Sequence, residues 1–274
     1  MKKILIPTDF SDCAANAVQV GLELAKKSNA ELHFLHVLST PVDWKKLRKE
    51  QEKNFPDTLH EIGHAKAMLT QLEQKSKKAE IKTKTSLVFD NNEISTIINN
   101  YDHDFIIMGS HGTKGIKEVL GSNTQKVVRN SFSPVLVIKK KFKKWEIKNI
   151  VFASDFEKDV HFPFRKIIEF ADLMKAQIHL LNVNMPFHFN ETDETESKMD
   201  SFLKKCPRGT CTINIYNALN EERGIEKFSK KIKADVIAMT THGKTGFMKM
   251  IAPSITESLV NHCDIPILSI NLKK

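Results

Sequence analysis

The chain has 274 residues, 41% of them hydrophobic, and a net charge of +9, which suffices for two domains with buried cores. Its apolar runs are too short to span a membrane, and its N-terminus does not resemble a signal peptide. The lysines are dispersed in short runs, so the charge permits an anionic partner but predicts no specific nucleic-acid interface.

Four cysteines without a dense spacing pattern are typical of a reducing compartment, so we expect a cytoplasmic protein. Cys206 and Cys211 are the one close pair. No second pair and no histidine at ligand spacing accompanies them, so the sequence predicts no metal site.

The first 101 residues alternate apolar runs with helical patterns. We expect strands at residues 4–6, 32–37 and 81–89, because these runs are short and rich in branched apolar residues. A helix is expected at 14–25, with Ser11 as its N-cap, and a shorter one at 93–101. Between them lies a long polar segment with an apolar stripe at helical spacing. Its first part, residues 44–57, is either a mobile loop or a separate short helix.

Residues 104–138 then give a strand, a glycine-rich loop, a helix and another strand. The apolar run 105–108 ends at Met108 and leads into Gly109 and Gly112. A second turn, Gly121-Ser122, precedes the helical pattern, and Pro134 precedes the last apolar run. In this arrangement backbone N–H groups and a helix N-terminus can hold a phosphate.

The chain then repeats itself. The segment around Asp155 matches that around Asp9 at an offset of 146 residues (155 − 9), and the segment ending at Gly243 matches that ending at Gly112 at 131 (243 − 112). Long matches in a fixed order indicate two copies of one domain. We therefore predict domains at 1–140 and 149–274, joined by a basic linker at 141–148.

Alternating buried strands and helices predict an α/β fold, a parallel sheet with helices on both faces in each copy. Such sheets bind ligands at the carboxyl ends of the strands, where the strand order reverses. We expect the ends of the first and fourth strands, around Asp9 and Gly109, to be neighbours there.

The motifs IPTDF and GSHG, with the later GSNTQKVVRNSFSPVLVI, resemble the universal stress protein family in its tandem form. The resemblance implies two Rossmann-like domains similar to adenine nucleotide alpha hydrolases, each with a five-stranded parallel sheet. It implies a stress-response protein that binds ATP or AMP, with or without Mg²⁺, and hydrolyses it very slowly if at all. The implied nucleotide site comprises Pro7, Thr8, Asp9, Val37, Met108, Gly109, His111, Gly112, Gly121, Ser122, Asn123 and Thr124.

The family's loop has nine residues between its second and third glycines, whereas eight lie between Gly112 and Gly121 here. In the second copy Thr240 replaces the first glycine and Pro253 the third, so that site is predicted to be degenerate. No catalytic residue is predicted, because no histidine lies at a spacing that would activate Ser122. His111 is expected to pack in the loop.

Two alternatives stay open. Asp9 could cap the following helix instead of contacting a ribose. The whole chain could also be a nucleotide-free interaction protein that uses both domains as a docking surface. The resemblance further implies that the last strands of the two copies pair within one chain, because apolar edges would otherwise invite aggregation. Dimerisation of whole chains stays open.

Overall fold

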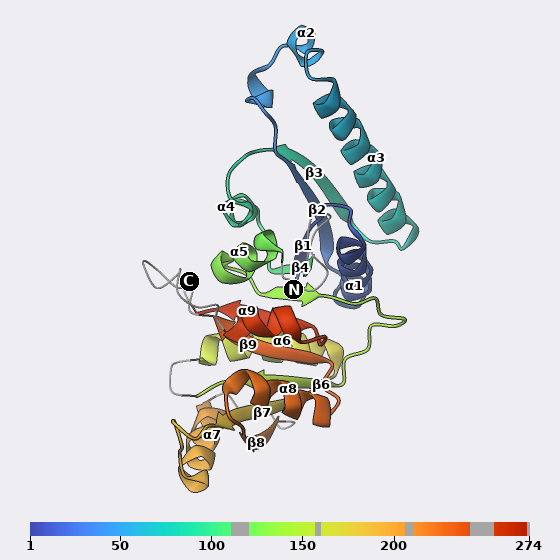
Figure 1. Ribbon diagram of the computed structural model, residues 1–274. Coiled ribbons are helices and arrows are strands. Elements are labelled where there is room, and N and C mark those ends of the chain that lie inside the picture. Colours follow the sequence, from blue (N-terminus) through green and yellow to red (C-terminus); the bar gives the residue numbers. More distant parts are fainter. Residues whose placement is uncertain (111–120, 157–159, 206–210, 242–254, 273–274) are drawn as a thin grey trace.

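A computed structural model describes residues 1–110, 121–156, 160–205, 211–241 and 255–272. The first half is built from short buried strands alternating with helices, in the predicted order (Figure 1). Its elements are β1 (Lys3–Pro7), α1 (Asp12–Ser28), β2 (Glu31–Leu38), the 3₁₀ turn η1 (Trp44–Lys46), α2 (Lys49–Glu52), α3 (Pro56–Lys78), β3 (Thr83–Phe89), α4 (Ile94–Asn99), β4 (Phe105–Gly109), α5 (Ser122–Asn130) and β5 (Val135–Ile138).

The second half repeats this order without the extra short helices. Its elements are β6 (Asn149–Ala153), α6 (His161–Met174), β7 (Gln177–Asn184), α7 (Thr192–Lys205), β8 (Cys211–Asn217), α8 (Glu221–Lys231), β9 (Val236–Thr241), α9 (Ile255–His262) and β10 (Ile267–Asn271). In the first half, the stretch for which a loop or a short helix was expected contains η1 and α2, which resolves that alternative in favour of short helical turns.

The strands form one ten-stranded sheet in the order β3-β2-β1-β4-β5-β10-β9-β6-β7-β8. Within each half all pairs are parallel, as expected of a doubly wound α/β fold, whereas β5 and β10 pair antiparallel at the centre. The predicted fold class, two tandem five-stranded parallel sheets with helices on both faces, is therefore confirmed.

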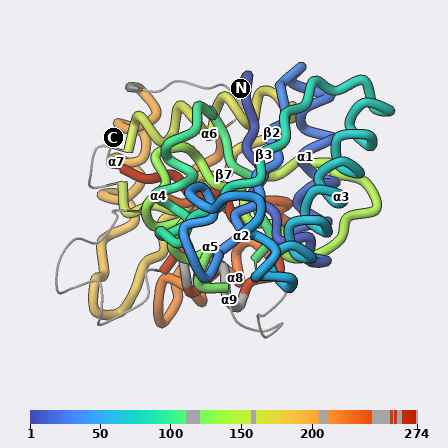
Figure 2. Tube along the Cα trace, turned by 90° about the horizontal axis from the view of Figure 1, so that it is seen from above, coloured from blue at the N-terminus to red at the C-terminus, as the bar shows by residue number. Residues whose placement is uncertain are grey.

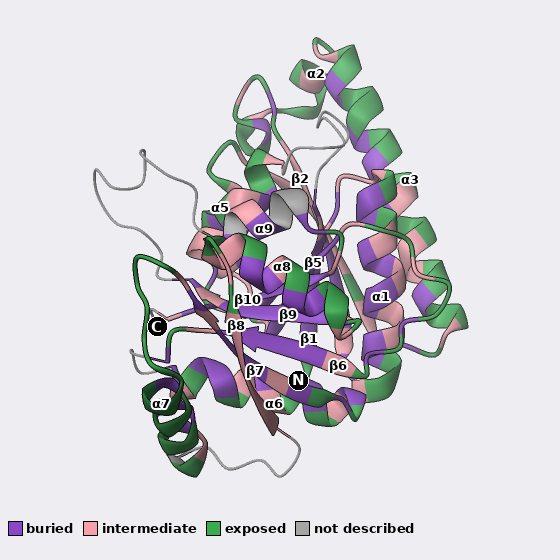
Figure 3. Ribbon diagram, turned by 60° about the horizontal axis from the view of Figure 1, so that its bottom comes forward, coloured by how far each residue is buried: buried purple, intermediate pink, exposed green. Residues whose placement is uncertain are grey.

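Side-chain alternation along the strands divides the apolar interior into two layers. One layer contains Ile4 and Ile6 and is covered by α1, α3, α6 and α7. The other contains Leu5 and is covered by α4, α5, α8 and α9. Figure 2 shows α1 and α3 together on one side, away from α4. In Figure 3 the central strands are buried, and the outer side of α7 is exposed.

The segment between β5 and β6 carries exposed lysines but is anchored to the fold. Trp145 is buried and its ring meets that of Phe142 edge-on, with centroids 4.8 Å apart. The backbone N–H of Trp145 donates to the carboxylate of Glu23 in α1. Packing of its aromatic residues therefore holds the linker against the fold, while its lysines face solvent. Among the helices of the described residues, none combines the length and apolar character needed to cross a bilayer.

Candidate functional site

The strand order reverses between β1 and β4. Ile4 and Leu5 of β1 pair with Phe105 and Ile106 of β4, while β2 lies on the other side of β1. The prediction that the ends of the first and fourth strands are neighbours is thus confirmed. The connections that follow β1 and β4 lead to α1 and α5 on opposite faces of the sheet, and in open α/β sheets ligands bind at such a point.

The end of β1 is held in place by a chain of hydrogen bonds. The Thr8 N–H donates to the carbonyl of Leu35, and the Thr8 hydroxyl accepts from the N–H of Phe10. His36 Nδ1 lies 2.7 Å from the Thr8 carbonyl oxygen, so that nitrogen carries the proton and donates. Phe10 has a positive φ of 62° and its ring stacks on that of His36, with centroids 4.6 Å apart.

Asp9 follows directly and points into the turn before α1. One of its carboxylate oxygens accepts from the N–H of Ser11, 3.2 Å away. Ser11 is the N-cap of α1, and its hydroxyl accepts from the N–H of Ala14. The prediction of Ser11 as N-cap is confirmed, and the alternative in which Asp9 itself caps the helix is wrong. Asp9 lies two residues before the N-cap, and its carboxylate stabilises the turn that leads into α1.

The end of β4 is tied to α5 across the glycine-rich loop. The Thr124 hydroxyl donates to the carbonyl of Gly109 over 3.0 Å, and the Gly121 N–H donates to the carbonyl of Ser110 over 2.9 Å. Thr124 and Ser110 are both buried. The two ends of the loop are therefore joined directly, and α5 starts immediately beside the end of β4.

The N-terminus of α5 has backbone donors that the helix itself does not use. The first intrahelical hydrogen bond runs from Gln125 N–H to Gly121 carbonyl, and the N-cap Gly121 has no side chain to cap the helix. The N–H groups of Ser122, Asn123 and Thr124 thus have no acceptor within the helix. Such groups, together with the positive end of the helix dipole, favour an anion.

Gly109 has a packing reason to be glycine. A Cβ built there would lie 2.7 Å from the backbone carbonyl carbon of Cys13, closer than packed atoms allow. The first turn of α1 therefore lies directly on the end of β4. This packing is sufficient to explain a glycine at position 109 without a contact to a nucleotide.

The other predicted site residues occupy different roles. Pro7 is the last residue of β1, Val37 is half-buried near the end of β2, and Met108 is buried in the core beneath the site. Met108 can therefore reach a ligand only through its backbone. His111 and Gly112 lie outside the described residues.

Sequence reasoning missed His36 and Phe10. The repeat holds a signal for Phe10, since Phe156 follows Asp155 as Phe10 follows Asp9, again with a positive φ, of 55°. At the position equivalent to His36 the second copy has Asn182, whose amide donates to the Ser154 carbonyl. The contact is thus conserved between copies by a different side chain.

In the second copy the end of β6 has the same backbone hydrogen bond as the end of β1, but its acidic surroundings differ. Ser154 N–H donates to the Leu181 carbonyl, as Thr8 does to Leu35. Burial first, and then repulsion from Asp155, raise the pKa of Glu221 above its usual range. The acidic pair makes the end of β6, where Asp155 lies, less suited to an anion. Thr240 lies in β9, while His242, Gly243, Pro253 and Ser254 are outside the described residues.

A family model described as the universal stress protein family matches residues 1–139 and 218–271. A universal stress protein of Methanocaldococcus jannaschii is 32% identical over 159 residues, which cover 51% of this chain and 96% of that protein. The crystal structure of a universal stress protein from Archaeoglobus fulgidus aligns with a TM-score of 0.76 at 21% identity, over 98% of both chains. A universal stress protein solved in complex with cAMP aligns with 50% of this chain and 96% of its own, at 22% identity and a TM-score of 0.40.

Proposed function

Because the chain belongs to the universal stress protein family, we propose that its N-terminal half binds an adenine nucleotide, ATP or AMP, at the carboxyl ends of β1 and β4. The observation that carries the proposal is the bond from Thr124 to the Gly109 carbonyl, which holds the N–H groups of the first turn of α5 beside the end of β4. These groups bind the phosphates, with Gly112 and Gly121 flanking them.

The nucleoside lies on the β1 side of the crevice. Asp9 accepts from the ribose hydroxyls, because a carboxylate beside phosphates would be repelled unless Mg²⁺ intervened. Pro7, Thr8 and Val37 form the base pocket. The ring of Phe10 stacks on that of His36, and this contact holds the backbone at the end of β1 in place.

The second copy does not bind nucleotide in this proposal. Its edge carries the Asp155–Glu221 pair, and Thr240 stands where the first copy has Gly109. The protein acts as a cytoplasmic nucleotide-binding component of a stress response. Within the residues that we can describe, no group of three acidic, histidine or cysteine side chains is placed to hold a metal ion. Any Mg²⁺ would therefore arrive with the phosphates.

Isothermal titration with ATP, AMP and cAMP, each with and without Mg²⁺, tests the proposal. Asp9→Asn keeps the oxygen that accepts from Ser11, so the turn survives while the charge is lost. We expect one site per chain and weaker binding in Asp9→Asn, with no change in the matched Asp155→Asn variant. No heat with the unaltered protein, or equal losses in both variants, would refute it.

A second candidate is a nucleotide-free interaction protein. The observation that favours it is that the close packing of Gly109 against Cys13 already explains this glycine without a ligand. A purified chain without excess absorbance at 260 nm and without a thermal shift on adding ATP or AMP would support this candidate over nucleotide binding.

We also propose that the two domains, 1–140 and 149–274, stay paired in solution. Ile267, Leu268 and Ser269 of β10 pair with β5, and Phe105 stacks on Phe170 with centroids 5.7 Å apart. Small-angle scattering should give one compact particle, and two separated bodies would contradict the pairing. Sedimentation equilibrium on the same sample would show whether whole chains form a homodimer.

A further inference from the structure

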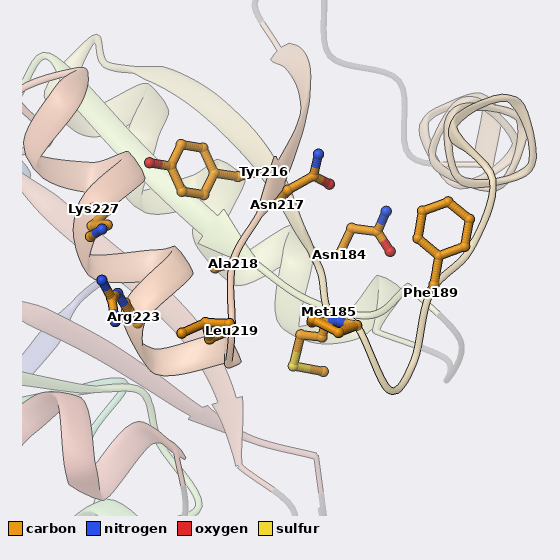
Figure 4. A pocket seen from close by; sticks show the side chains of 10 residues that line it. Asn184, Met185, Phe189, Tyr216, Asn217, Ala218, Leu219, Arg223 and Lys227 are labelled. Carbon is orange, nitrogen blue, oxygen red and sulfur yellow. The ribbon is translucent and has the colours of Figure 1, made fainter.

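An open pocket of about 420 Å³ lies in the C-terminal half, at the carboxyl ends of β7 and β8 (Figure 4). Its walls are the end of β7 with the following loop, the end of β8, and the first turns of α8. The side chains that matter for its chemistry are Asn184, Phe189, Tyr216, Asn217, Arg223 and Lys227. Its size falls in the range of small-molecule sites, roughly 300–1,000 Å³. It shares none of these residues with the proposed nucleotide site.

One wall of the pocket carries two cationic side chains, Arg223 and Lys227. Arg223 and Lys227 are four residues apart on α8 and so lie on the same side of the helix. Within the described ranges, neither side chain has a recorded ion pair or hydrogen bond. Glu221 lies about 200° around the helix from Arg223. As far as the described residues go, the pocket therefore presents two cations without an acidic partner to a molecule that enters it.

The nearby acidic groups are already engaged elsewhere. Glu222 accepts from the Ser258 hydroxyl over 2.7 Å, and Glu226 pairs with Lys230. Among the described residues, neither carboxylate forms an ion pair with Arg223 or Lys227.

The mouth of the pocket is apolar and exposed. Among the described residues, three of the seven exposed large hydrophobic side chains, Phe187, Phe189 and Leu219, lie on the two loops beside it, with exposures of 93%, 68% and 67%. Clusters of exposed apolar groups in soluble proteins commonly mark binding sites. Tyr216 also lines the pocket. Its ring meets that of Phe228 edge-on, with centroids 6.0 Å apart.

The pocket is held open by its own hydrogen bonds and packing. The Asn184 side chain donates to the Asn190 carbonyl and accepts from the Asn190 N–H, which closes the loop that carries Phe189. At Gly224 an added Cβ would lie 2.4 Å from a methyl of Val183, so α8 lies directly on β7. The cationic helix and the aromatic loop are thus fixed relative to the same strand.

In the corresponding corner of the first copy, a buried aromatic side chain packs against two others. There Trp44 is buried, with its ring 6.2 Å from that of Phe89 and 6.0 Å from that of Phe55. Asn91 fastens the loop by accepting from the N–H of Thr40 and donating to its carbonyl. The stretch 90–100 contains no lysine or arginine. An open, cationic pocket is therefore a property of the second copy and not of the shared fold.

We propose that this pocket binds a small amphipathic anion: a planar apolar body between Phe189, Leu219 and Tyr216, with a carboxylate, phosphate or sulfonate on Arg223 and Lys227. The guanidinium gives a two-point contact to such a group, and the lysine adds a point charge. Asn217 supplies an amide at the edge. The proposal stands independently of nucleotide binding in the first half.

The test uses the full chain and the fluorescent aromatic sulfonate 8-anilinonaphthalene-1-sulfonate. We expect saturable binding that weakens about tenfold when Arg223→Met and Lys227→Met are combined, and severalfold in Phe189→Ala. Lys231→Met, on the same helix, and Phe132→Ala, an exposed phenylalanine on another loop, are the matched controls and should bind as before. A partly unfolded variant would bind more dye, so misfolding cannot imitate the expected loss.

Competition then identifies the kind of anion. Displacement by benzoate or phenyl phosphate supports an aryl acid, and displacement by AMP in a Ser122→Pro background supports a nucleotide as the natural member of the class. Unchanged dye binding in the double variant overturns the proposal. So does displacement by acidic peptides alone, which would make the pocket a protein-docking surface.

Discussion

The hydroxyl of Thr124 donates to the carbonyl oxygen of Gly109 over 3.0 Å, and this bond joins the first turn of α5 to the last residue of β4. Both partners are predicted phosphate-site residues, yet the hydroxyl is engaged with the protein itself. Thr124 therefore acts on a ligand by positioning the helix that offers its N–H groups. This relationship separates the site into groups that bind and groups that hold them in place.

Thr124→Val tests the positioning role. Valine fills the same space but leaves the Gly109 carbonyl without its partner, so we expect a loss of about 1–2 kcal/mol in the free energy of unfolding. Urea denaturation measures this loss, and titration with ATP should show weaker binding because α5 can shift. Ser131→Ala serves as control, since its hydroxyl joins residues at the far end of α5. Unaltered ATP affinity in a destabilised Thr124→Val would contradict the positioning role.

Ser122→Pro removes one donor from the site without breaking the helix. Ser122 is the first residue of α5, where proline is tolerated, and the preceding Gly121 has φ −60° and ψ 138°, which a following proline accepts. We expect unchanged thermal stability and a roughly tenfold weaker affinity for ATP, because a charge-assisted hydrogen bond to phosphate is lost.

Ser122→Ala keeps the backbone N–H and is the matched control for this proline. It should bind ATP nearly as the unaltered chain does. If alanine and proline weaken binding equally, the hydroxyl and not the N–H contacts the nucleotide, and the backbone-donor model is wrong.

Gly109→Ala probes the close approach of α1 to β4. The added Cβ would fall 2.7 Å from the Cys13 carbonyl carbon, and because this contact is with backbone, α1 must move as a unit. We expect a loss of about 1–3 kcal/mol in the free energy of unfolding, the usual range for overpacking. Thr240→Ala at the equivalent position of the second copy should cost less than half of that. Equal stability of Gly109→Ala and the unaltered chain would show that α1 adapts freely.

Periodicity and the internal repeat were enough to predict the strand order at the switch point. Strands such as Phe105–Gly109 are short, apolar and buried on both faces. Because the domain occurs twice, the same sequence pattern could be compared between the two copies. The N-cap at Ser11 could also be predicted, because the capping contact involves only residues 11–14, which are neighbours in the sequence.

Contacts between segments that are far apart in the chain could not be predicted from the sequence pattern. The reason for Gly109 lies in Cys13, 96 residues earlier in the chain (109 − 13), and the partner of Thr8 in the site is His36. Both depend on how closely two elements pack. The pocket around Arg223 was missed for the same reason, since its walls come from three segments that only the fold brings together.

Acid should destabilise the fold through His33. Burial, more than the nearby Lys84, lowers the pKa of His33 to about 4, and its Nε2 lies 2.8 Å from the Ser86 hydroxyl. Because the unfolded chain then binds more protons than the folded one between pH 6.5 and 4, stability is full above pH 6.5 and falls as pH drops through this window, by on the order of 2 kcal/mol. His33→Gln keeps a neutral polar group and should flatten urea midpoints plotted against pH, whereas His60→Gln, on the exposed side of α3, should leave the slope as it was. An identical slope in His33→Gln would assign the acid sensitivity to other groups, among them His103 and His179, whose pKa values burial also lowers.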